Sequence, residues 1–149
     1  MVKKNKVIKI IAVVSLFGLL ISLYSWLHNQ GFAQGEFCKL DDVFDCDVVN
    51  KGPFSKIMGI PVSLIGILGY GFLFAGSIVK IKNMEDYQLT LFLLLASIGG
   101  FTFSLYLTAL EAFVLKAWCL LCLTSQFIIF ATTVLLLRMF LEEHKKVEK

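Results

Sequence analysis

The chain has 149 residues, of which 58% are hydrophobic and 17% charged, and its formal net charge is +3. A domain of this size buries too small a fraction of its surface to hide so much apolar area from water. The composition therefore excludes an ordinary water-soluble domain and predicts one compact domain, residues 1–149, that lies in a lipid bilayer.

Four long segments carry no charged residue. Each reaches the roughly 18 to 20 residues that a transmembrane helix needs. The sequence therefore predicts an all-α, multi-pass membrane protein built as a four-transmembrane-helix bundle. We expect the helices at about 8–28, 57–80, 87–110 and 116–138, with an outer loop at 29–56.

Basic residues lie mainly beside these segments. The N-terminus, the connection at 80–88 and the C-terminus hold ten of the 14 Lys and Arg, whereas the loop at 29–56 is net negative. Basic clusters that flank apolar segments orient membrane proteins, and this role accounts for the positive charge. The basic residues therefore do not indicate a nucleic-acid partner, and none is expected. We predict an integral protein of the cell (inner) membrane with both termini cytoplasmic and the loop extracytoplasmic. A cleavable signal peptide is an alternative for the first segment, and it would also deliver the loop outside.

Small residues recur at four-residue spacing along the third segment. They are Ala96, Gly100, Ser104 and Thr108. A stripe of this kind lets helices approach closely in a membrane, so we expect a neighbouring helix to pack against it.

The four cysteines fall on one side of the predicted bundle. Cys38 and Cys46 belong to the outer loop, and Cys119 and Cys122 lie at the outer end of the fourth helix. Disulfides form and persist outside the cytoplasm. We therefore expect two redox pairs near the outer surface.

Cys119 and Cys122 form a CxxC motif. On a helix, the Cβ atoms of residues three positions apart lie about 5–6 Å from each other, near enough for a disulfide after modest adjustment. The positive end of the helix dipole would stabilise a thiolate there. The alternative is a pair of buried small apolar side chains.

Cys38 and Cys46 lie eight positions apart on a loop rich in glycine. Their disulfide could simply staple the loop, contributing about 2–3 kcal/mol. Alternatively, this pair moves between a soluble partner and the CxxC pair. A zinc site is not expected, because one pair lies in a membrane helix and the other lacks the close spacing of zinc ligands.

Five segments together form a specific signature: 37–38, 46–50, 54–55, 59–66 and 117–122. By these segments, most of the chain resembles the vitamin K epoxide reductase family in its prokaryotic form. The resemblance implies a bundle that encloses a quinone of the menaquinone or ubiquinone type, with CxxC facing the ring.

The resemblance also implies roles for single residues. Cys122 would react with the quinone, Cys119 would exchange with Cys46, and Cys38 would complete the loop pair. Ser55 matches the family's loop serine close to the active site, so Cys122 and Ser55 are the expected quinone contacts. The electron donor would be a thioredoxin-like (DsbA-like) extracytoplasmic protein on a separate chain, because these 149 residues include no such domain.

Two positions depart from vertebrate members, which place a tyrosine and an asparagine where this chain has Gln126 and Val62. We therefore expect quinone reduction rather than epoxide reduction. The predicted function is a quinone-linked thiol–disulfide oxidoreductase that reoxidises its partner and drives disulfide formation outside the cytoplasm. The alternatives are a DsbB-like oxidase, in which CxxC precedes the wider pair, and a non-catalytic scaffold subunit stapled by disulfides.

Overall fold

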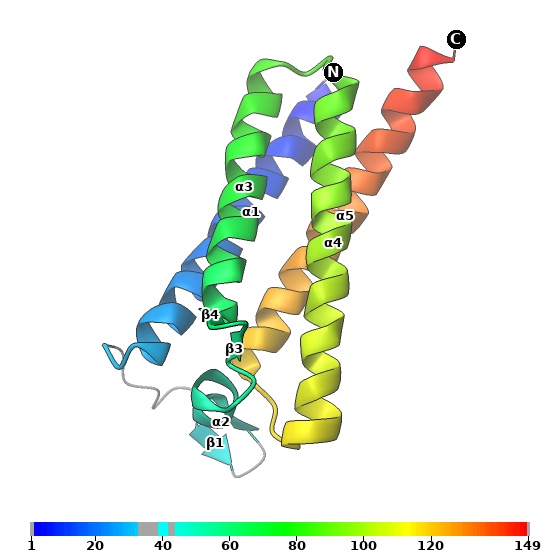
Figure 1. The fold of residues 1–149 in the computed structure, drawn as a ribbon. Helices are drawn as coiled ribbons and strands as arrows, with labels where there is room; N and C mark the ends of the chain where they lie inside the picture. Colours follow the sequence, from blue (N-terminus) through cyan, green and yellow to red (C-terminus); the bar gives the residue numbers. More distant parts are fainter. Residues whose placement is uncertain (1, 33–38, 42–43, 149) are drawn as a thin grey trace.

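A computed structural model describes residues 2–32, 39–41 and 44–148 of the chain (Figure 1). Four of its helices are long and apolar enough to cross a membrane. The prediction of an all-α membrane bundle is confirmed. The long helices are α1 (Val2–Asn29), α3 (Val62–Lys82), α4 (Tyr87–Leu110) and α5 (Leu120–Val147).

The two ends of the bundle differ in what they carry. Figure 1 shows both chain termini and the short connection between α3 and α4 at one end, here called the terminal end. The opposite end, the loop end, carries the short elements between α1 and α3. These are β1 (Lys39–Asp41), β2 (Phe44–Asp45), α2 (Cys46–Lys51), β3 (Lys56–Ile57) and β4 (Ile60–Pro61).

The second long helix begins five residues later than predicted, at Val62 rather than at 57. Strands β3 and β4 pair in an antiparallel hairpin whose turn contains Met58 and Gly59, with φ angles of 53° and 85°. Positive φ at both turn residues suits a tight hairpin and ends any helix. Pro61 then fixes the extended entry into α3.

The connection from α4 to α5 also differs from the prediction of a helix starting at 116. A π-helical turn, η2 (Glu111–Leu115), follows α4, and Lys116 is left-handed with φ 51°. The chain then stays extended through Cys119, which caps α5. Helix α5 continues to Val147 rather than ending at 138, because its last residues are good helix formers.

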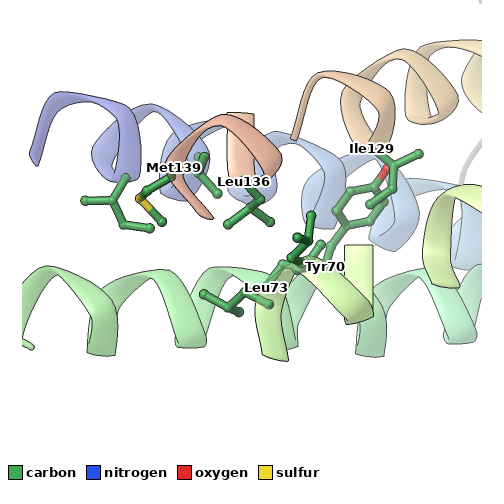
Figure 2. Close-up of a cluster of buried hydrophobic side chains, with 9 residues drawn as sticks. Tyr70, Leu73, Ile129, Leu136 and Met139 are labelled. Atoms are coloured by element: carbon green, nitrogen blue, oxygen red, sulfur yellow. The ribbon is translucent and has the colours of Figure 1, made fainter. Parts of the chain in front are cut away.

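The apolar core lies toward the terminal end of the bundle. Figure 2 shows Tyr70 and Leu73 of α3 facing Ile129, Leu136 and Met139 of α5. Gly18 of α1 permits this packing, because a Cβ atom there would lie 2.4 Å from Cε1 of Tyr70. The Tyr70 ring cannot move aside freely, since its hydroxyl donates to the Ser125 carbonyl at 2.7 Å.

A buried charge network closes the terminal end. The Glu143 carboxylate lies 3.1 Å from Lys80 Nζ and 3.4 Å from Lys4 Nζ. Lys80 is fully buried and also donates to the Asp86 carbonyl at 2.6 Å. Buried charges need such partners, so this network fixes how α1, α3 and α5 meet.

We predict that Gly18→Ala destabilises the fold by about 1–3 kcal/mol, because the added methyl group overlaps the Tyr70 ring. Thermal unfolding in detergent measures the change. Gly71→Ala is the matched control, since its Cβ would meet only Leu19 Cδ1, at 3.9 Å. Equal stability of the two variants would contradict the proposed contact.

Candidate functional site

Helix α2 brings Cys46 to the loop end of the bundle. Asp45 starts the helix by accepting the Asp47 backbone N–H at 2.8 Å. Cys46 and Asn50, one turn apart, are the buried residues of this helix. Because residues four apart share a helix face, one face of α2 turns both side chains into the protein.

Polar contacts dock α2 against the end of α1. Ser25 Oγ donates to Asn50 Oδ1 at 2.9 Å, and the Asn29 side chain donates to the Asn50 carbonyl. His28, which is 1% exposed, places Nε2 at 3.1 Å from Asp47 Oδ1. These contacts set the position of Cys46 relative to the bundle.

Cys46 and Cys119 meet at this docking point. Their Sγ atoms are 3.4 Å apart, and the residues are only 1% and 0% exposed. An isolated β-bridge between Phe44 and Trp118 joins the two segments just before the cysteines. Sulfur atoms in contact, shielded from water, are placed for thiol–disulfide exchange.

The cysteines occur in two oxidation states. Cys46 is disulfide-bonded, whereas Cys119 and Cys122 are free thiols. The Cys122 backbone N–H donates to Cys119 Sγ at 3.4 Å, so Cys119 caps α5 with its own sulfur. Cys38 lies outside the described residues, and its pairing with Cys46 stays a prediction.

A cavity of about 580 Å³ lies inside the bundle and is bordered by Cys122. Its walls are mainly apolar side chains and glycines of α1, α3, α4 and α5, with a few hydroxyl groups. The small-residue stripe of α4 lines this cavity. Helix α5 does approach the stripe at Gly100, where an added Cβ would lie 3.4 Å from Ile129 Cδ1. The small side chains thus admit a neighbouring helix and also leave room for a ligand.

The cavity is partly open, and two of its lining glycines, one on α3 and one on α4, are exposed on the outside of the bundle. They are Gly69 and Gly99. A Cβ atom added at either glycine would meet no atom within 4 Å. In a bilayer this opening would face lipid, and an apolar molecule could enter from there.

A second, smaller cavity of about 40 Å³ lies beside the first, toward the loop. It is lined by Ser55, Asn50 and Cys122, and by Glu111 at the start of η2. The structure thus brings Ser55 and Cys122 to one cavity. Val62, at one of the two departures from the vertebrate pattern, lines both cavities, and Gln126, at the other, accepts a hydrogen bond from Thr108.

Two polar residues of this site were missed from the sequence. Asn50 is 8% exposed and lines both cavities, and its Nδ2 has no hydrogen-bond partner among the described residues. Glu111 is 2% exposed. Glu111 had a usable signal, because it is the only acidic residue between Asp86 and Glu142. Asn50 lies in one of the segments that carry the family resemblance, but no other sequence feature distinguishes it from Asn29, the other asparagine of the loop.

Comparison with known proteins agrees with this geometry. Residues 9–137 match the sequence model of a family described as the Vitamin K epoxide reductase family. This range includes all four cysteines. No curated protein sequence matches the chain.

The contact between Cys46 and Cys119 predicts rapid cross-linking. In a Cys38→Ser/Cys122→Ser variant, mild oxidation with diamide should join the remaining two cysteines, because sulfurs in contact at 3.4 Å need only a small shift to reach the S–S bond length of about 2.05 Å. Mass spectrometry of the digested, non-reduced protein detects the bond. The matched control, Cys38→Ser/Cys119→Ser, should cross-link more slowly; equal rates in the two variants would contradict the contact.

Proposed function

Because the chain belongs to the vitamin K epoxide reductase family, we propose that it is a quinone-linked thiol–disulfide oxidoreductase that reoxidises a thioredoxin-like protein. The partner is a separate extracytoplasmic chain, and the activity drives disulfide formation outside the cytoplasm. The observation that carries this proposal is the contact of 3.4 Å between the thiol of Cys119 and the disulfide-bonded Cys46.

The proposed exchange follows the order of cysteines that the family resemblance implies, and the contact between Cys46 and Cys119 supports its central step. The partner's dithiol first reduces the loop pair, Cys38 and Cys46, and becomes a disulfide. The Cys46 thiolate then attacks Cys119 in the oxidised CxxC pair, forming a Cys46–Cys119 bond and releasing Cys122. Cys38 resolves this mixed disulfide, which leaves Cys119 and Cys122 as thiols. The two electrons have moved from the loop to the interior of the bundle.

The large cavity has the character that a membrane quinone requires. A bound quinone would accept two electrons and two protons. The cavity is bordered by the Cys122 thiol and is walled mainly by apolar groups. Asn50 offers an unpartnered, buried amide donor suited to a carbonyl oxygen, while its Oδ1 is held by Ser25. A menaquinone or ubiquinone type would reach these residues from the bilayer, past the exposed glycines of α3 and α4.

The protein is an integral membrane protein, and we propose that its cysteines lie on the extracytoplasmic side. Two facts support this orientation. The termini and the α3–α4 connection share one end of the bundle, and these regions hold most of the Lys and Arg. The disulfide-bonded Cys46 lies at the other end, where an oxidising compartment would preserve it.

The function is tested with purified protein, a soluble quinone analogue and a reduced thioredoxin-like substrate, following quinone absorbance. We expect the wild type to reduce the quinone and Cys122→Ser to lose this activity while its thermal stability is kept. A scaffold stapled by disulfides would instead lose stability alone. If the wild type reduces quinone no faster than Cys122→Ser, the proposed function is wrong.

Asn50→Leu tests the proposed quinone contact. Loss of one hydrogen bond of about 0.5–1.5 kcal/mol should raise the KM for quinone roughly 2- to 12-fold. Ser25→Ala removes only the hydroxyl group that donates to the side-chain oxygen Oδ1 of Asn50, so it should raise the KM for quinone less. An unchanged KM in Asn50→Leu would argue against Asn50 as a quinone contact.

A further inference from the structure

Glu111 is a buried carboxyl group at the redox centre that the relay of cysteines does not use. It is 2% exposed, although it belongs to a helical segment that is apolar enough to cross a membrane. An ionisable side chain in such a segment is costly to bury and is usually functional. It also lies at the first residue of η2, and π-helical turns are frequent at functional sites.

The Glu111 carboxyl contacts both residues of the CxxC pair. Its Oε2 accepts the Cys119 backbone N–H at 3.2 Å, and the same carboxyl group interacts with the Cys122 side chain. Its other oxygen, Oε1, is buried and hydrogen-bonds to no residue in the part of the chain that the structure describes. Oε2 therefore accepts a backbone hydrogen bond, whereas Oε1 makes no hydrogen bond to the described residues.

A purely structural role explains only half of these contacts. A carboxylate near the start of α5 would stabilise the helix by accepting a backbone N–H and by interacting with the helix dipole. Helix α5 is already capped by Cys119, and a neutral acceptor could hold the Cys119 N–H equally well. Capping therefore does not account for a second carboxyl oxygen that is buried without a partner, in a carboxyl group that interacts with the Cys122 side chain.

We propose that Glu111 is the proton donor and acceptor for the Cys122 thiol when the CxxC disulfide opens and closes, an inference that rests on the proposed exchange with Cys46. As Cys46 attacks Cys119, the S–S bond to Cys122 breaks and its electron pair goes to Cys122 Sγ. The carboxylic acid of Glu111 gives this sulfur a proton and becomes a carboxylate. In the reverse step, the carboxylate takes the proton back as Cys122 attacks Cys119.

The surroundings of Glu111 suit this role. Among the described residues that line the small cavity, Glu111 and Cys122 are the ones with ionisable side chains. Ser55, Ser63 and Asn29 supply polar groups on the same cavity. At about 40 Å³ it has room for a water molecule, so these groups can pass a proton between Glu111 and the loop. A thiolate buried here without a proton donor beside it would be costly, because burial disfavours an unpaired charge.

Glu111→Gln tests the proposal, because glutamine keeps an oxygen for the Cys119 N–H but cannot exchange a proton. The full chain in detergent, with both cysteine pairs oxidised and no quinone present, is mixed with dithiothreitol. Acid quenching, maleimide labelling and peptide mass spectrometry then follow the appearance of the Cys122 thiol. We expect Glu111→Gln to slow it about 100-fold, at the lower end of the range for acid–base catalysis.

Three controls separate proton transfer from loss of structure. Glu142→Gln removes an exposed carboxylate of α5 and should leave the rate unchanged. In a Cys119→Ser/Cys122→Ser background, Glu111→Gln should not alter reduction of the loop pair. In the Cys38→Ser/Cys122→Ser background, diamide should cross-link Cys46 to Cys119 equally fast with and without Glu111→Gln.

Two results would overturn the inference. One is an exchange rate in Glu111→Gln within about twofold of the wild type, far from the effect of a lost acid–base group. The other is loss of the Cys46–Cys119 cross-link in this variant, which would make Glu111 a support for the backbone alone. The measurement uses no quinone, so a failure of the quinone assay would not be mistaken for a failure of this inference.

Discussion

The structure depends on one requirement: a sulfur carried by a polar loop must touch a sulfur at the head of a membrane helix, out of reach of water. The contact between Cys46 and Cys119 meets it. Several otherwise unusual features serve this contact. Asp45 caps a helix of only six residues, Phe44 bridges to Trp118, and the chain before Cys119 stays extended after a π-helical turn. Each feature removes freedom from one of the two sulfurs, which raises the rate of a reaction between them.

The two halves of the bundle divide the work. The terminal half is filled by apolar side chains and braced by Lys80 and Glu143, so it holds the helices in place. The loop half is less densely packed, because it contains a cavity of about 580 Å³. Cavities of this kind lower stability, because their walls lose contacts that a filled core would provide. The packed terminal half offsets that loss, and the cysteines of the proposed exchange lie in the half that can hold a ligand.

Local patterns explain which parts of this description the sequence could predict. The four spans follow from uncharged segments, a property that each segment has by itself. The start of α3 was misplaced because the uncharged segment begins with a hairpin, whose turn at Met58 and Gly59 contains no charged residue. The start of α5 was misplaced because it depends on a bridge from Trp118 to the distant loop. The stripe that includes Gly100 predicted a neighbouring helix but not the cavity, since small residues permit both. The isolated acidic residue Glu111 could have been singled out from the sequence, but the roles proposed for Asn50 and Glu111 depend on what lies beside them in space.

The exposed glycines of α3 and α4 separate the two substrates of the proposed reaction. A soluble protein would reach the loop from water, whereas a lipid-soluble acceptor can reach the cavity from the bilayer, past the exposed Gly69 and Gly99. The two molecules then use different entrances, and neither has to leave before the other arrives. The acceptor then reaches the protein by diffusing within the plane of the bilayer. Its concentration there is its concentration in the lipid. The membrane thus serves this fold as a reservoir as well as a solvent.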